Sequence, residues 1–255
     1  MVLGPEFRLA EKPCIDGLVA LGYSYLPPAE SKEAVQVAAE NRRAGDNGAA
    51  RDGLNHVLLR EELIAAVQSL NDVPEEVARA VYQELLGVRD NEKWTSLLRG
   101  QYSRTVPGEA TKKTIRLIDF LDPANNTFTV TNQFKVKAEK TRIADIVVYI
   151  NGIPLVVIEA KSPLAPKDKT GEAFDQIKQY ERDIPRLFYS NLFSMVTDGV
   201  HVLYGATGAP AAYWGAWKDP WPRQREEFGN ALEPGPILPA GTSAIARSAG
   251  PFCGL

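Results

Sequence analysis

The sequence has few of the residues on which several common kinds of site depend. Its 255 residues include two cysteines, Cys14 and Cys253, and two histidines, His56 and His201. The cysteines lie near opposite ends of the chain and form neither a metal-binding spacing nor a disulfide framework. Neither histidine stands in a spacing with other metal ligands, which disfavours zinc hydrolases and histidine-based nucleases.

Several motifs are missing as well. There is no G-x-x-x-x-G-K-[S/T] run, so we expect no ATP site in this chain, and there is no G-x-S-x-G motif. No apolar run approaches the roughly 18–20 residues of a membrane span. The start of the chain has no basic segment followed by an apolar core, so we expect no secretory signal. These absences predict a cytoplasmic protein without a membrane partner.

Positive charge is not in excess. Lys and Arg number 29 against 32 Asp and Glu, which gives a net charge of −3. A protein that holds nucleic acid mainly through counterion release would be basic. If this chain acts on DNA, a local basic stripe or a partner must therefore bring the DNA to it.

Hydrophobic periodicity predicts helices first and a sheet afterwards. Helical spacing covers most of 11–100, strand-like alternation follows from 107, and one more helix is expected at 171–183. We expect an α/β fold with a mixed sheet flanked by helices, preceded by a helical N-terminal region. The domain would span 1–208, with its helical part at about 5–100 and its sheet at about 107–208. Residues 209–255 would be a linker or tail. The expected strands are 115–120, 128–136, 143–150, 155–160, 193–197 and 200–204.

Three charges interrupt the most apolar stretch, residues 142–161. Asp145 lies in one strand-like run, Glu159 and Lys161 end the next, and Asn151-Gly152 separates the two runs. Because removing a charge from water costs several kcal/mol, charges in buried strands usually have a function. An acid followed by Glu-x-Lys at the end of an apolar strand is the pattern that a metal-dependent phosphodiesterase needs.

Two carboxylates at close range repel each other unless a cation lies between them. Asp145, Glu159 and the backbone carbonyl of Ala160 are oxygen ligands suited to Mg²⁺, for which Mn²⁺ can substitute. The ion would activate a water, and Lys161 would orient the attacking hydroxide or neutralise developing charge. The alternative is a salt-bridged strand end, in which Lys161 pairs with Glu159 near solvent, since short charge motifs often match by chance.

The metal site requires a particular register. A strict two-residue loop at Asn151-Gly152 pairs Asp145 with Ile158, which leaves Glu159 on the opposite face. An odd-length loop, or one bulge, pairs Asp145 with Glu159 instead. Because Pro154 cannot donate a ladder hydrogen bond, we expect an irregular, odd-length connection here.

Two further groups of residues could contact a substrate. Gln176 and Tyr180 are spaced i, i+4 and share one face of the expected helix, either at the site or as ordinary packing residues. A basic group precedes Asp145 and could meet a phosphate backbone or simply form a solvated strand face. Its members are Lys135, Lys137, Lys140 and Arg142.

Taken together, these residues resemble a known family, the N-terminal nuclease domain of the restriction (R) subunit of type I restriction-modification enzymes. That domain belongs to the PD-(D/E)xK nuclease superfamily, and the match covers about residues 8–205. It rests on Arg142-Ile-Ala-Asp145, Asn151-Gly-Ile-Pro-Leu, Ile158-Glu-Ala-Lys161-Ser-Pro163, Ala173-x-x-Gln176-Ile-x-x-Tyr180, Glu11-Lys-Pro13, Leu21-Gly-Tyr23, Leu117-Ile-Asp119-Phe120, Asn125-x-x-Phe128 and Asn132-Gln133-Phe134.

The resemblance implies roles by position. Asp145 and Glu159 match the metal-binding acids and Lys161 the catalytic lysine of a type I site-specific deoxyribonuclease. Gln176 and Tyr180 match the family's Gln-x-x-x-Tyr element, which is connected with DNA handling or cleavage. A further residue, Glu11, matches an acid on the first helix that approaches the metal.

The resemblance also implies partners. Double-stranded DNA is the expected substrate, and the family's full subunit carries an ATP-driven translocase and works with methylation and specificity subunits. The last residues before Leu255 do not resemble such a motor, so we expect a shortened subunit, with ATP used only by the full-length family protein. Two alternatives remain: a stand-alone PD-(D/E)xK nuclease in repair or defence, or a catalytically dead DNA-binding or assembly module.

Overall fold

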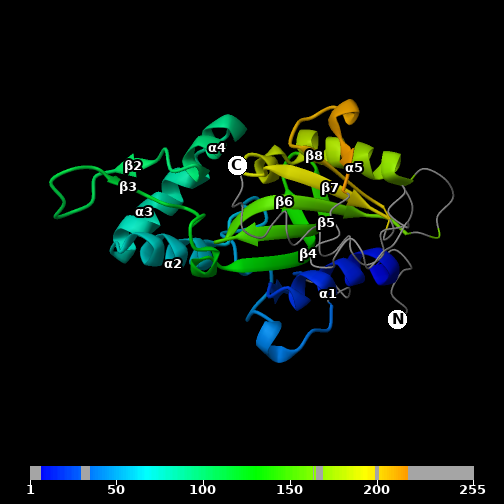
Figure 1. Cartoon of the computed structure of the whole chain (residues 1–255), viewed down its shortest axis with the longest axis horizontal. Helices are drawn as coiled ribbons and strands as arrows, with labels where there is room; N and C mark the ends of the chain where they lie inside the picture. The colour runs from blue at the N-terminus through cyan, green and yellow to red at the C-terminus, as the bar shows by residue number, and fades with distance from the viewer. Residues whose placement is uncertain (1–6, 30–34, 163, 165–168, 199–200, 218–255) are drawn as a thin grey trace.

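A seven-stranded mixed sheet forms the centre of the molecule, which confirms the predicted fold class (Figure 1). The structure, a computed structural model, describes residues 7–29, 35–162, 164, 169–198 and 201–217. The pairs β1–β4 and β6–β7 are parallel, and the other neighbours are antiparallel. In sheet order the strands are β1 (Ser24–Leu26), β4 (Phe128–Lys137), β5 (Thr141–Ile150), β6 (Ile153–Ala160), β7 (Phe193–Thr197), β8 (Val202–Ala206) and β9 (Gly215–Ala216).

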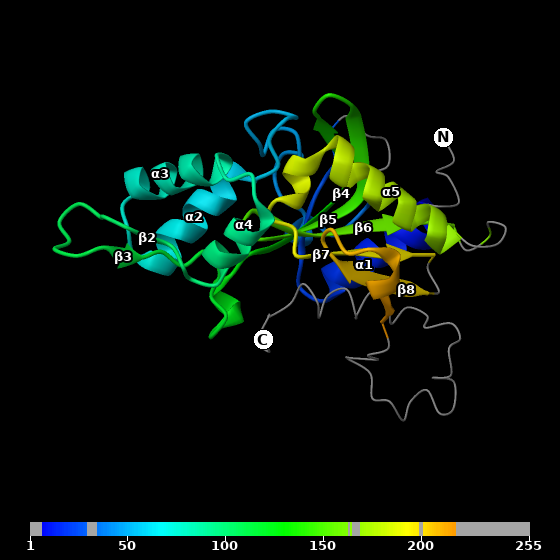
Figure 2. The same cartoon turned by 90° about the horizontal axis from the view of Figure 1, so that it is seen from above.

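Helices cover both faces of this sheet. Helix α1 lies against β1 and β4 on one face, and α5 lies against β5, β6 and β7 on the other (Figures 1 and 2). Of the helices that the structure describes, none combines the length and apolarity that crossing a bilayer requires. The helices are α1 (Lys12–Ala20), preceded by the π-helical turn η1 (Phe7–Glu11), α2 (Arg60–Asn71), α3 (Glu75–Leu86), α4 (Asn91–Leu98) and α5 (Lys169–Asp183), with short 3₁₀ turns at Ala39–Asn41, Pro123–Asn125, Pro185–Phe188 and Ala211–Tyr213.

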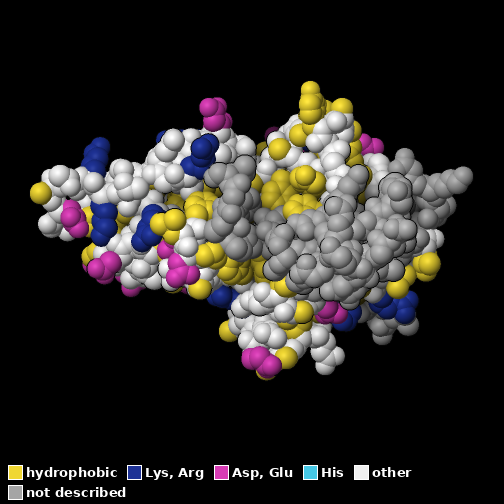
Figure 3. Space-filling model, in the orientation of Figure 1, with side chains coloured by type: hydrophobic (Ala, Val, Ile, Leu, Met, Phe, Trp, Pro, Cys, Tyr) yellow, Lys and Arg dark blue, Asp and Glu magenta, His cyan; other side chains and the backbone are white. Residues whose placement is uncertain are grey.

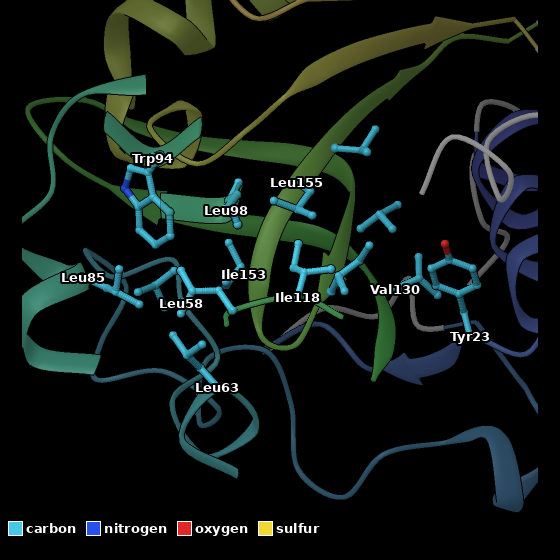
Figure 4. Packing of buried hydrophobic residues seen from close by; sticks show 14 of the residues in the cluster. Tyr23, Leu58, Leu63, Leu85, Trp94, Leu98, Ile118, Val130, Ile153 and Leu155 are labelled. Atoms are coloured by element: carbon cyan, nitrogen blue, oxygen red, sulfur yellow. The ribbon is translucent and has the colours of Figure 1, made fainter. Parts of the chain in front are cut away.

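Helices α2, α3 and α4 gather at one end of the sheet, beside a small hairpin of β2 (Ser103–Arg104) and β3 (Lys113–Thr114) (Figure 1). Their apolar faces continue the core of the sheet. Figure 4 shows Leu63 of α2 and Trp94 of α4 in the same buried cluster as Ile153 and Leu155 of β6. Burial on both faces explains why β6 is an uninterrupted apolar run up to Glu159.

The turn between β5 and β6 is fixed against α2. Asn151 and Gly152 both have left-handed backbones, with φ of 52° and 74°. Gly152 donates its N–H to Glu62 Oε1 at 3.1 Å and accepts from the N–H of Leu59 at 2.9 Å. The buried Asn151 side chain donates to the carbonyl of Leu117 at 2.9 Å. These bonds hold the hairpin that carries the predicted metal ligands.

The predicted strand at 115–120 is wrong. Strand β3 ends at Thr114, although Ile115 and Leu117 are buried as the alternation implied. Side-chain amides take the place of a neighbouring strand here. Arg116 N–H donates to Asn71 Oδ1 at 2.7 Å, and further along the segment Asp119 N–H donates to an amide oxygen at 2.9 Å.

The sheet extends further along the chain than the sequence indicates. Strand β1, from the part expected to be helical, pairs with β4, and β9 pairs with β8 inside the expected 209–255 tail. Trp214 lies edge-on to Phe174 of α5 and so packs the end of the described chain onto the domain. The rest of the expected tail, 218–255, lies outside the described residues. The hairpin predicted from 193–197 and 200–204 is present as β7 and β8.

Candidate active site

A bulge in β6 brings the two predicted acids into register. Ile150 pairs with Ile153 across a two-residue turn, so the expected odd-length connection is wrong. Tyr149 then pairs with Pro154 but Val148 pairs with Val156, which leaves Leu155 as an extra residue on β6. Beyond the bulge Ile146 pairs with Ile158. The next residues in that register are Asp145 and Glu159.

The two carboxylates lie close together, with Asp145 in the middle of β5 and Glu159 near the end of β6. Asp145 Oδ2 accepts a hydrogen bond from the backbone N–H of Ala160 at 2.9 Å. The Glu159 side chain is fully buried. Burial raises the pKa of Glu159 well above its ordinary value, and the neighbouring Asp145 carboxylate raises it further. Such repulsion between acids is what a bound cation relieves.

Lys161 joins the pair from the adjacent position on the same face. Its ammonium lies 2.6 Å from Glu159 Oε1 and 3.0 Å from Gln176 Oε1 on α5. Only 11% of the Lys161 side chain is exposed. The ion pair of the alternative interpretation is therefore present, but it is largely buried and does not form a solvated strand end.

Gln176 and Tyr180 connect this lysine to the backbone of β5. Gln176 Nε2 donates to the Tyr180 hydroxyl, which in turn donates to the carbonyl of Ile143 at 2.8 Å. Burial raises the pKa of Tyr180, and the negative charge of Glu159 adds to that effect, so the phenol stays protonated. These two hydrogen bonds orient the amide of Gln176 so that its oxygen faces Lys161.

The donor set suits a hard divalent ion. Glu159 Oε2 is buried and has no hydrogen-bond partner among the described residues, so one carboxylate oxygen is uncompensated beside Asp145. No group of three or more His, Cys, Asp or Glu side chains within the described part of the chain could hold a metal. The protein ligands would then be two carboxylates and a backbone carbonyl, and Mg²⁺ commonly keeps several waters with so few protein ligands.

Glu11 lies at the end of η1, a turn that contacts β6. It is only 3% exposed, and both of its carboxylate oxygens accept from Gln133 Nε2 on β4, at 3.1 and 3.0 Å. The structure thus brings Glu11 to β4 and to β6, the strand of Glu159, but not into a three-carboxylate cluster with the two acids.

The four basic residues before Asp145 divide into two pairs. Arg142 Nε donates to Asp183 Oδ2 at 2.7 Å, and Lys140 Nζ lies 3.3 Å from Asp183 Oδ1, so this carboxylate balances their charge. Lys135 is half-buried and Lys137 is exposed, as expected for outward positions that alternate with core residues.

Positive and negative side chains also lie close together away from the candidate site. On the face shown in Figure 3, Lys and Arg side chains are interspersed with Asp and Glu over the helical end of the molecule. That face therefore presents no single basic stripe among its described residues, in line with the net charge of −3.

Three residues that contact the site were given no role from the sequence alone. The roles of Gln133, Ile143 and Asp183 depend on contacts with partners 122, 37 and 41 positions away along the chain. For Gln133 the available signal was a polar run at 131–133 inside an apolar strand. The other two carry no local signal.

Comparison with known proteins gives a consistent result. Residues 5–212 match the family model described as "Type I restriction enzyme R protein N terminus". The type I restriction enzyme HindI endonuclease subunit of Haemophilus influenzae is 34% identical over 181 residues, which is 66% of this chain and 17% of that protein. A putative type I restriction enzyme endonuclease subunit of Methanocaldococcus jannaschii, MjaIXP, is 30% identical over 225 residues, 82% of this chain and 20% of that protein. The chain thus spans a fifth or less of the length of these relatives.

Proposed function

The chain belongs to the family of type I restriction enzyme R protein N termini, and on that basis we propose that it is a metal-dependent endonuclease domain that hydrolyses DNA phosphodiester bonds. The observation that carries the proposal is the convergence of Asp145, Glu159 and Lys161 in one largely buried cluster. Two further observations support it: the raised pKa of Glu159 and its uncompensated oxygen.

Asp145, Glu159 and the Ala160 carbonyl would hold Mg²⁺ or Mn²⁺. When bound, such an ion supplies a water of lowered pKa and stabilises charge on the scissile phosphate. Asp145 is held for this task by the Ala160 N–H, which fixes the position of its Oδ2. The acidic pair also needs the ion, because two buried carboxylates side by side are otherwise unfavourable.

Lys161 would neutralise negative charge that develops at the phosphate or orient the attacking water. Its ammonium donates to Glu159 and Gln176, which fix its position beside the acids. Gln176 and Tyr180 would act mainly on this lysine: they hold the ammonium in place through neutral hydrogen bonds that leave its positive charge intact.

DNA, and the remaining parts of a type I restriction complex, are proposed partners. The relatives are named as endonuclease subunits, and this chain corresponds to a small part of them. Methylation and specificity subunits would supply recognition of the DNA sequence, and an ATP-driven translocase in the longer proteins would deliver the DNA. Delivery by other parts agrees with the acidic net charge.

Nicking of supercoiled plasmid tests the proposal. The chain is incubated with Mg²⁺ or Mn²⁺ beside Asp145→Ala and, as a control, Asp16→Asn, which changes an exposed carboxylate on α1. The proposal predicts metal-dependent nicking by wild type and Asp16→Asn that is lost in Asp145→Ala. Efficient cleavage at low protein concentration would favour a stand-alone nuclease. DNA binding without any metal binding would overturn the proposal in favour of a non-catalytic module.

A further inference from the structure

Gln133 adopts an unusual backbone conformation in the middle of a strand. Its φ is 47°, in the left-handed region. The other described non-glycine residues with positive φ are Asp72 and Asn151, which end a helix and form a turn. Those are residue types and places where the left-handed region is tolerated, whereas a glutamine inside a strand is a strained exception. Strain of this kind persists only where the surrounding structure enforces it, and it concentrates at functional sites.

The conformation changes which way β4 faces. Asn132 pairs with Ile146 and Phe134 pairs with Ala144, and the regular register is interrupted at the rung between them, that of Gln133 and Asp145. Residues four apart in a regular strand share one face. Val130 and Phe134 nevertheless belong to different buried clusters, on opposite sides of the sheet. The strand therefore switches faces at Gln133, directly beside the candidate metal ligand Asp145.

The switch aims the side chain of Gln133 at Glu11. The amide nitrogen donates to both carboxylate oxygens, at 3.1 and 3.0 Å, across 122 positions of sequence. Glu11 is nearly inaccessible to solvent, and its turn η1 contacts β6, the strand of Glu159. Glu11 is thus tied to the rung of Asp145 on one side and placed against the strand of Glu159 on the other.

We propose that Gln133 is a positioning residue that holds the Glu11 carboxylate beside the Asp145–Glu159 pair, at the cost of a strained backbone. The inference rests on the proposed function, because the positioned carboxylate serves the same metal site. A neutral amide can orient a carboxylate without cancelling its charge, which a lysine at this position would do. Glu11 then acts from outside the ligand set: it adds negative charge and a hydrogen-bond acceptor for water near the ion.

A purely structural role makes a different prediction. If the bond only fastens η1 to β4, its loss should lower stability and leave metal binding unchanged. If Gln133 positions Glu11, Gln133→Gly should weaken metal binding as well. Because glycine adopts a φ of 47° freely, the relief of backbone strain should offset part of the stability that is lost with the bond. Gln133→Lys separates the two roles in a second way. It keeps a hydrogen-bond donor within reach of Glu11 but neutralises the negative charge of the Glu11 carboxylate.

Calorimetric titration of the 255-residue chain with Mn²⁺, together with thermal melting, tests the inference. We expect Gln133→Gly and Gln133→Lys to bind Mn²⁺ about 10-fold more weakly than wild type, a typical effect for a residue that orients a metal site from outside. The melting temperature of Gln133→Gly reports the lost hydrogen bonds and the relieved strain together, so the Mn²⁺ affinity decides between the two roles. In a Glu11→Gln background, Gln133→Gly should cause no further weakening, because the two residues act through one interaction.

The possible contrary outcomes are distinct. Wild-type affinity in Gln133→Gly, or an equal loss with and without Glu11→Gln, would overturn this inference and leave the proposed function standing. An absence of Mn²⁺ binding by the wild-type chain would overturn the metal site itself and this inference with it.

Discussion

The Lys161 ammonium lies 2.6 Å from Glu159 Oε1, and the Glu159 side chain is fully buried. The lysine and a metal ion at Oε2 would therefore share the negative charge of one carboxylate, so each cation weakens the attraction for the other. Lys161→Met should lower plasmid nicking by at least about 100-fold, the usual effect of removing a group that stabilises transition-state charge. Mn²⁺ binding, measured by calorimetry, should be kept or strengthened.

A matched control is Lys178→Met, which removes a lysine of α5 that pairs with Glu181 and does not contact Lys161 or Glu159. It should nick plasmid as wild type does. If Lys161→Met lost Mn²⁺ binding while remaining folded, the lysine would be a support for the acids, and its catalytic role would be wrong.

Tyr180→Phe tests the connection from Lys161 to the backbone of β5. The hydroxyl donates to the Ile143 carbonyl at 2.8 Å and accepts from Gln176, so its loss frees the amide that orients Lys161. We expect nicking to fall about 10-fold with Mn²⁺ binding unchanged, and the free energy of unfolding to fall by about 1 kcal/mol for the lost hydrogen bond.

Tyr149→Phe is the control for this variant. Tyr149 is also buried and donates one hydrogen bond to a backbone carbonyl, that of Val57 at 3.1 Å, but it does not contact Lys161 or Gln176. It should lose similar stability and keep full activity. Equal activity of Tyr180→Phe and Tyr149→Phe would show that Tyr180 only packs in the core and does not orient Lys161.

Gly152→Ala tests how the β5–β6 hairpin is held. A Cβ at this position would lie 2.6 Å from the Leu59 carbonyl oxygen and 2.8 Å from the Leu63 nitrogen, both backbone atoms, and φ is already 74°. The strained conformation and the overpacking should together lower the free energy of unfolding by about 3 kcal/mol, measured by denaturant titration.

Gly100→Ala separates these two effects. Gly100 has a φ of 82°, but a Cβ there would meet no atom within 4 Å. This variant should therefore cost only about 1 kcal/mol, the cost of the left-handed backbone. Equal losses in the two variants would show that contact with α2 does not constrain the turn.

Asp183→Asn tests the pairing of Arg142 and Lys140. Hydrogen bonds from Arg142 and Lys140 lower the pKa of Asp183 below its ordinary value. A carboxyl group with a lowered folded-state pKa contributes stability above its unfolded pKa of about 3.9, and that contribution is lost as the pH falls through the folded value. The difference in melting temperature between wild type and Asp183→Asn should be largest near neutral pH and shrink below about pH 4. A difference that stayed constant from pH 7 to pH 3 would contradict this account.

Elements with long, regular patterns were predictable. Strands β4, β5 and β6 and helix α5 follow from alternation, from continuous apolar runs or from helical spacing over eight to fifteen residues. The segment at 115–120 shows the limit of this reasoning. Its apolar residues alternate because they pack on the core, but its N–H groups bond to side chains of Asn71 and Asn126, which no local pattern reveals.

The same limit applies to the site. The types of residue at 145, 159 and 161 indicated an acidic pair and a lysine, and the need for a one-residue shift between strands followed from simple geometry. The structural origin of that shift was not predicted: it is a bulge at Leu155 inside β6, and the turn itself has two residues. The ion pairs of Arg142 and Lys140 could not be predicted, because their partner, Asp183, is distant in sequence.

The central claim is that Asp145 and Glu159 together hold one divalent ion. Calorimetric titration with Mn²⁺ of wild type, Asp145→Asn and Glu159→Gln tests it most directly, with Asp16→Asn as the control. The account predicts one ion bound per chain by wild type and by Asp16→Asn, and binding abolished in the other two variants, each of which leaves a single carboxylate. Mn²⁺ binding that survived in both Asp145→Asn and Glu159→Gln would contradict it.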